Sequence, residues 1–281
     1  MQLQEKAMLT FLTISQWTAR KHDKRATQEV AEKYHVRGEA GRYHKVLIAR
    51  EELKEIQKIA SAARTFHYTN TLPWSDDGNR ILTAANYFAY TTALQQLKAK
   101  FAAHVSQFCQ EYQTLVANQV RRLNDLYNPA DYPAPSVIES KFSLDIVISP
   151  LPDSNDFRVR LQAEELARIQ QEISQREQEL LAKAMQECWR RLYAVVQHMA
   201  DKLQQTEATF RDSLVGNIIS LVQLLPQLNI THDPELESMR KQIEAKLTQA
   251  SPDDLRTSSH IRKNVAQDAS AILDAMTGYL A

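Results

Sequence analysis

Glycine is scarce in this chain, with 5 residues among 281. Parallel α/β enzymes use glycine for tight turns and for loops that approach phosphate groups. The motifs GxGxxG, GxxxxGK[ST], HExxH and GxSxG are all missing from the sequence. These absences argue against a nucleotide-dependent enzyme or a hydrolase of those classes. We therefore expect a protein that is not an enzyme and that carries no cofactor.

Cysteine is also rare, since Cys109 and Cys188 are the only two thiols. Two cysteines cannot build a disulfide framework, and they cannot alone complete a structural zinc site. The eight histidines are scattered, and none stands three or four residues from another. The sequence therefore predicts free buried thiols and no metal site.

Charge of one sign is not in excess, because 34 basic residues balance 34 acidic ones. Such a chain is not built as a whole to coat nucleic acid or an anionic membrane. The apolar run at Met8–Ile14 is short and interrupted by threonine. No later run reaches the roughly 18 apolar residues that a membrane span requires. We expect a cytoplasmic protein without a membrane segment.

Two long stretches, 83–127 and 161–203, contain neither glycine nor proline. Each repeats apolar residues at steps of three and four, which is typical of a heptad seam. The seam residues are Leu94, Leu97, Phe101, Val105, Phe108, Tyr112, Leu115 and Leu123, then Leu166, Ile169, Ile173, Leu180, Leu192, Val195, Met199 and Leu203. Matched lengths favour a long antiparallel coiled-coil hairpin. An intermolecular coil obeys the same physics, so self-association stays open.

The segment between these helices is rich in proline, which stops helices. Alternating apolar residues at 142–148 predict a strand, and the alternation resumes at 157–161 after a turn. We expect a small β-hairpin module at the tip of the helical arm, over residues 137–161. An isolated two-stranded hairpin is marginal in water, so this module should pack on something else.

The flanking regions predict shorter elements and complete a mainly α fold. Residues 1–82 should contain a strand or first helical turn at 7–15, a helix at 49–65 and an aromatic loop at 66–82. Residues 83–205 would form the helical hairpin. Residues 206–281 should form packed helices, with the apolar one at 214–225 stopped by Pro226.

Three groups of residues together resemble a known but uncharacterised family. They are Leu72-Pro73-Trp74 with Asp77-Gly78-x-Arg80, then Leu126-Tyr127-Asn128-Pro129-x-Asp131-Tyr132-Pro133, and finally Phe142-x-Leu144 with Pro150-Leu151-Pro152 and Asp156-Phe157-Arg158-Val159. The family occurs in phages and integrative mobile elements, often encoded beside a MoxR-type AAA+ ATPase related to the cobaltochelatase small subunit. The resemblance covers about residues 70–165 and implies a protein partner. It supplies no catalytic residues.

The first functional hypothesis is a non-catalytic helical scaffold or adaptor that docks on a protein partner such as an AAA+ ATPase. The long arm and its β tip motivate it. The candidate docking residues at the tip are Tyr132, Phe142, Asp156, Phe157 and Arg158.

The alternative hypothesis is a nucleic-acid-binding accessory protein that uses a basic stretch at residues 20–50. Lysine and arginine outnumber acidic residues there, and such an excess can contact phosphates. The candidate residues are Arg20, Lys21, Lys24, Arg25, Arg37, Arg42 and Lys45. No helix-turn-helix, zinc or aromatic stacking motif accompanies the charge.

Overall fold

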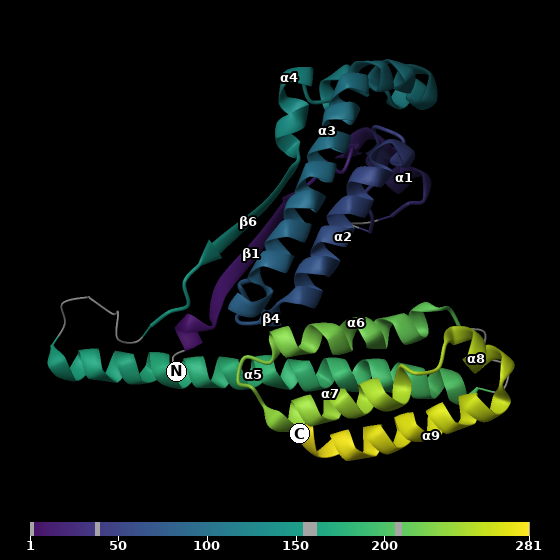
Figure 1. Ribbon diagram of the computed structural model, residues 1–281. Coiled ribbons are helices and arrows are strands. Elements are labelled where there is room, and N and C mark those ends of the chain that lie inside the picture. The colour runs from purple at the N-terminus through teal and green to yellow at the C-terminus, as the bar shows by residue number, and fades with distance from the viewer. Residues whose placement is uncertain (1–2, 37–39, 154–161, 206–209, 281) are drawn as a thin grey trace. The chain divides into compact units, whose positions relative to one another are not determined.

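The computed structural model describes residues 3–36, 40–153, 162–205 and 210–280 (Figure 1). The fold is mainly helical with a small antiparallel sheet, as the sequence predicted. The chain forms two compact units, and each is assembled from separate stretches. Unit 1 comprises Met1–Phe11, Tyr68–Tyr90 and Val147–Ala281, and unit 2 comprises Leu12–His67 and Thr91–Ile146. The three successive segments expected from the sequence, 1–82, 83–205 and 206–281, stay a prediction.

The helices of unit 1 are α5 (Ala163–Gln204), α6 (Ser213–Leu228), α7 (Pro234–Leu247), α8 (Pro252–Thr257) and α9 (Ser259–Met276). Helix α5 packs on α6 and α9, and α7 packs on the same two helices (Figure 1). Ser251 begins α8 with a capping box to Asp254, and Asp233 caps α7. These short helices match the sequence expectation, except that α6 continues through Pro226 to Leu228. Pro226 has no N–H to donate to the carbonyl of Val222, so α6 loses one ladder hydrogen bond there and ends two residues later.

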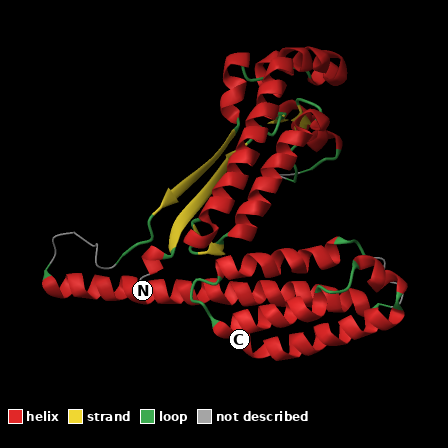
Figure 2. Ribbon diagram, viewed as in Figure 1, coloured by secondary structure: helices red, strands yellow, loops and turns green. Residues whose placement is uncertain are grey.

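The sheet has the strand order β4-β5-β1-β6 and contains strands from distant parts of the chain. Its members are β1 (Ala7–Ser15), β4 (Leu72–Pro73), β5 (Arg80–Thr83) and β6 (Ser143–Ser149). Figure 2 shows the long strands β1 and β6 side by side. The predicted strand at 142–148 is therefore confirmed, but it pairs with β1. The predicted return strand at 157–161 lies outside the described residues.

Unit 2 is built around helices α1 (Lys24–Lys33), α2 (Lys54–Asn70), α3 (Tyr87–Leu123) and α4 (Pro135–Ile138), with strands β2 (Arg20–His22) and β3 (His44–Val46). Counting both units, short 3₁₀ turns lie at Leu3–Glu5, Arg50–Leu53, Ala84–Asn86, Asn124–Leu126, Pro129–Asp131, Glu139–Lys141 and Thr277–Tyr279. The α3 seam residues Phe101, Val105, Phe108 and Tyr112 are buried, as predicted. Phe108 meets the ring of Phe142, with centroids 5.7 Å apart.

The two long helices are confirmed, but their pairing as one coiled-coil hairpin is not. Helix α5 buries Leu192, Met199 and Leu203 in the core of unit 1, against α6 and α9. Residues 91–123 of α3 bury their seam within unit 2. A stripe at steps of three and four specifies an apolar helix face but not its partner. The sequence therefore predicts which face of each helix is apolar, but it does not predict what that face packs against.

The aromatic loop expected at 66–82 is shorter than predicted. Helix α2 continues to Asn70, and β4 and β5 occupy most of the remainder. Trp74 is buried. A turn at residues 75–78 joins β4 to β5, with the Gly78 N–H donating to the Ser75 carbonyl at 3.4 Å.

Candidate anion-binding cleft

A two-stranded ribbon in unit 2 forms the wall of the candidate site. The chain enters it at Ala19, a buried residue with a φ of 50°, and the Ala19 carbonyl accepts the Leu47 N–H at 2.7 Å. The left-handed backbone at this residue redirects the chain from β1 into β2. Strand β2 then pairs with β3 in antiparallel register.

The register decides which side chains share a face. His22 lies opposite His44, and Arg20 lies opposite Val46. Side chains alternate along a strand, so these four residues occupy one face of the ribbon. Lys45 and its register partner Lys21 fall on the other face, where Lys21 is exposed and still borders the cleft.

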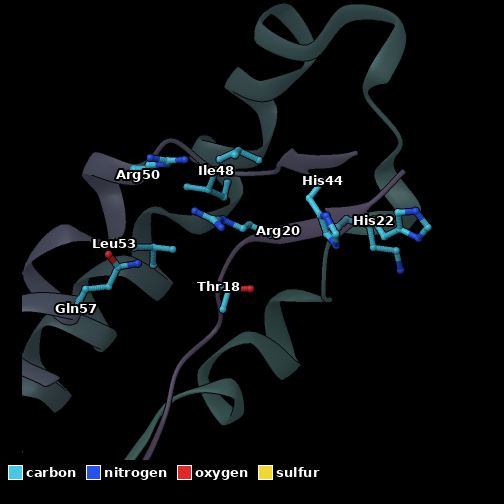
Figure 3. Close-up of a pocket in the computed structure, with 10 residues that line it drawn as sticks. Thr18, Arg20, His22, His44, Ile48, Arg50, Leu53 and Gln57 are labelled. Carbon is cyan, nitrogen blue, oxygen red and sulfur yellow. The ribbon is translucent and has the colours of Figure 1, made fainter. Parts of the chain in front are cut away.

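A cleft of about 820 Å³ opens between this face and the start of α2 (Figure 3). Its lining residues are Thr18, Arg20, Lys21, His22, His44, Val46, Ile48, Arg50, Leu53 and Gln57. In Figure 3, Arg20 and Arg50 lie near Ile48, and the two histidines lie at the other end. Arg20, Lys21 and Arg50 are all exposed. None of the ten described lining residues is acidic, so the cleft concentrates positive charge.

The histidine pair is held in place by hydrogen bonds. The ring centroids of His22 and His44 are 5.4 Å apart. The single hydroxyl hydrogen of Thr27 is donated to the Asp23 carbonyl at 2.7 Å, so Thr27 Oγ1 accepts from His22 Nε2 at 3.1 Å. His22 therefore carries a proton on Nε2. His44 Nδ1 donates to the Arg42 carbonyl at 3.3 Å, because a carbonyl can only accept.

Lys45, predicted to contact nucleic acid, is buried instead. Its side chain is 5% exposed, and its ammonium lies 2.9 Å from Asp23 and 2.6 Å from Asp131. It also donates to the Leu126 carbonyl at 2.8 Å. Lys45 lies on the ribbon face opposite Arg20 and is buried there, and its two carboxylate partners neutralise its charge.

The other predicted nucleic-acid residues have mixed positions. Arg20 and Lys21 line the cleft, and Lys24 is exposed at the start of α1. Arg25 is exposed but pairs with Glu29 at 2.9 Å. Arg42 is exposed and lines a neighbouring recess described below. Arg37 lies outside the described residues.

The predicted docking residues of the β tip do not form an exposed patch in the described chain. Phe142 is buried, at 8% exposure. Tyr132 is half-buried and donates to the Leu47 carbonyl at 3.0 Å. Burial raises the pKa of Tyr132 to about 12, so its hydroxyl remains a donor at neutral pH. Asp156, Phe157 and Arg158 lie outside the described residues.

Sequence reasoning missed His22, His44 and Arg50 as members of one site. Two histidines far apart in sequence gave no signal, because their meeting depends on the β2–β3 register. Among the described residues, no group of three or more His, Cys, Asp or Glu side chains is arranged to hold a metal ion. Burial raises the pKa of the Cys188 thiol to about 12, and Cys188 lies in the unit 1 core.

Comparison with known proteins gives no relative that could help to interpret the cleft. None of the described helices is both long and apolar enough to cross a membrane. No family model, curated protein or solved structure matches the chain.

Proposed function

We propose that this protein binds nucleic acid through the cleft between the β2–β3 ribbon and the start of α2, without a catalytic step. The observation that carries the proposal is the lining of the cleft. Arg20, Lys21 and Arg50 line it together with His22 and His44, and none of its described lining residues is acidic. Phosphate groups are the common biological ligands of such clustered cations.

The basic surface extends beyond the cleft, which favours a polymer over a small phosphorylated molecule. Lys24 and Arg42 are exposed and line a second recess that shares His22 with the cleft. A chain of phosphates can contact both sets of cations at once. Because the whole protein has zero net charge, the attraction for phosphate groups comes from this local concentration of cations.

The test is a salt titration of oligonucleotide binding followed by fluorescence anisotropy. The probe variant is the double substitution Arg20→Ala and Arg50→Ala. Its matched control is Lys100→Ala with Arg121→Ala, which removes the same charge from exposed positions on α3 outside the cleft. Circular dichroism checks that both variants keep their helices.

The wild-type affinity should fall steeply with salt, by about 0.7 to 0.9 logarithmic units per phosphate contact for each tenfold rise. The cleft variant should bind more weakly with a shallower slope, and the control should stay close to wild type. Equal losses in the two variants would mean that binding follows net charge and not the cleft. Absence of binding at low salt would refute the proposal.

A second candidate is docking on a protein partner, which the family resemblance implies to be an AAA+ ATPase. Among described residues, Val147 and Ile148 on the edge strand β6 are 60% and 38% exposed. Exposed apolar residues on a sheet edge are suited to contact with another chain. Light scattering with and without a MoxR-type AAA+ ATPase tests this. A mass increase that disappears in Val147→Thr with Ile148→Thr supports it, and an unchanged mass excludes it.

A further inference from the structure

We infer that the nucleic acid bound by this cleft is single-stranded, and that one of its bases enters the apolar recess beside His22. This inference rests on the proposed function and specifies its substrate class. It comes from two adjoining hollows of different chemistry in unit 2. One is basic and suits phosphate, and the other suits the flat apolar face of a base.

The recess has a volume of about 570 Å³. Its lining residues are His22, Lys24, Thr27, Gln28, Val30, Ala31, Val36, Ala40, Gly41, Arg42 and Tyr43. Val30, Val36 and Tyr43 are 49%, 38% and 41% exposed, so this apolar surface is open to a ligand. No described residue of the lining is acidic. His22 borders the recess and the basic cleft alike, which makes them neighbours.

Tyr43 is held in position by its backbone. Its N–H donates to Thr27 Oγ1 at 3.0 Å, and its carbonyl accepts the Asp23 N–H at 3.0 Å. Asp23 also caps α1, where its side chain accepts the Ala26 N–H at 3.0 Å. The ring is thus exposed while its attachment is fixed. Stacking on such a ring costs little conformational entropy, which suits recognition of a base.

The combination selects single strands over duplexes. A duplex keeps its bases stacked and paired, so it offers phosphates and base edges to the protein but not the flat face of a base. A single strand offers an unstacked base within one nucleotide of each phosphate. Cations at Arg20 and Arg50 would hold the backbone, and Tyr43 would hold the base. Neither the cleft nor the recess alone favours a single strand over other ligands, but the two side by side do.

The experiment compares three fluorescent probes on the full-length protein. They are a short oligothymidylate, the same strand with abasic sites in place of its thymines, and a duplex of equal length. Each is titrated with wild type, Tyr43→Ala, Tyr43→Phe, and the control Tyr34→Ala. Tyr34 is 68% exposed and does not line the recess.

The single strand should bind more tightly than both the abasic strand and the duplex. Tyr43→Ala should weaken single-strand binding about tenfold and leave the abasic strand unchanged, since it removes only stacking. Tyr43→Phe should retain wild-type affinity, and Tyr34→Ala should as well. The salt slope should be the same in all four proteins, because no phosphate contact is lost.

Two results would overturn the inference, and they separate it from the proposed function. If Tyr43→Ala changes nothing while the Arg20 and Arg50 variants still weaken binding, the cleft binds phosphates but the recess takes no base. If the duplex binds as tightly as the single strand, base insertion is likewise excluded. If no probe binds in a manner that depends on Arg20 and Arg50, the proposed function itself fails.

Discussion

The ammonium of Lys45 lies 2.6 Å from a carboxylate oxygen of Asp131, and their side chains are 5% and 12% exposed. This contact joins strand β3 to the 3₁₀ turn Pro129–Asp131, and the lysine also pairs with Asp23 at the start of α1. Lys45 therefore fixes the back of the ribbon whose front forms the cleft. Removing it would leave two buried carboxylates without their cation.

Lys45→Met should lower the free energy of unfolding by about 3–5 kcal/mol, as when one partner of a buried ion pair is deleted. The matched control is Lys98→Met. Lys98 pairs with Asp145 at 2.6 Å, but both side chains are more than half exposed. The control should lose less than about 1 kcal/mol. Urea unfolding measures both, and equal losses would contradict the structural role of Lys45.

The stability difference between wild type and Lys45→Met should depend on pH at the extremes. Hydrogen bonds from Lys45 and the Ala26 N–H lower the pKa of Asp23. Its contribution is therefore present above about pH 3.9 and is lost as the pH falls through its lower folded pKa. Burial opposes the charge of Lys45, but its two carboxylate partners outweigh burial and raise its pKa. Its contribution is present below about pH 10.4 and is lost as the pH rises through its higher folded pKa.

Urea unfolding at a series of pH values should thus show a constant difference between about pH 5 and pH 9. The difference should shrink in acid below about pH 4, where Asp23 becomes protonated. A difference that grows in acid would contradict this assignment.

Arg191 on α5 binds backbone carbonyls at the C-terminal end of α2. Its guanidinium donates to the carbonyls of Tyr68, Thr69 and Thr71 at 3.0, 2.8 and 2.9 Å. Carbonyls at a helix C-terminus lack partners within the helix, so a cation there is favourable. Arg191→Met should cost about 2–4 kcal/mol in the free energy of unfolding.

The neighbouring Arg190 provides the control for this substitution. Its side chain is 67% exposed, and it pairs with the same Glu187 that Arg191 contacts. Arg190→Met should change stability by less than about 0.5 kcal/mol. Similar thermal shifts for the two variants would show that the carbonyl contacts of Arg191 contribute little.

Two glycines should respond to alanine in opposite directions. Gly78 has a φ of 94°, and an added Cβ would lie 2.7 Å from the ring of Phe11. Gly78→Ala should therefore destabilise by about 1–3 kcal/mol. Gly216 lies inside α6 with no atom within 4 Å of an added Cβ. Gly216→Ala should stabilise by about 0.5–1 kcal/mol, because alanine is the better helix former. Thermal unfolding distinguishes the two signs.

The helices could be predicted because their signals are local. The apolar stripe of α3 and the caps of α7 and α8 depend only on residues that are close together in the sequence. The partner of each stripe could not be predicted, since a helix face accepts any complementary apolar surface. Strand β6 was found by its alternation, but its pairing with β1 spans more than a hundred residues.

The cleft was predicted in part for a similar reason. The basic excess at 20–50 pointed to Arg20 and Lys21, which line it. Composition could not separate Arg20 from Lys45, because the face of each residue depends on the β2–β3 register. The same register brings His22 against His44.

Substitution of Phe142 distinguishes a residue packed in the interior from a docking residue on the surface. It is 8% exposed and contacts Phe108. Phe142→Ala should lower the free energy of unfolding by about 3–5 kcal/mol, as for other buried phenylalanines. Val137→Ala, at a side chain that is 43% exposed, should change it by less than about 0.5 kcal/mol. A neutral Phe142→Ala variant would restore the residue as a surface candidate.

Contact between nucleic acid and the cleft of unit 2 can be located by photo-crosslinking with mass spectrometry. A single strand that carries 4-thiothymidine is irradiated with the protein, and the modified peptides are identified. Crosslinks are expected within residues 18–57, including Tyr43, and they should disappear when Arg20 and Arg50 are both replaced by alanine. Crosslinks confined to the unit 1 helices, or crosslinks that persist in the double variant, would contradict contact at the cleft.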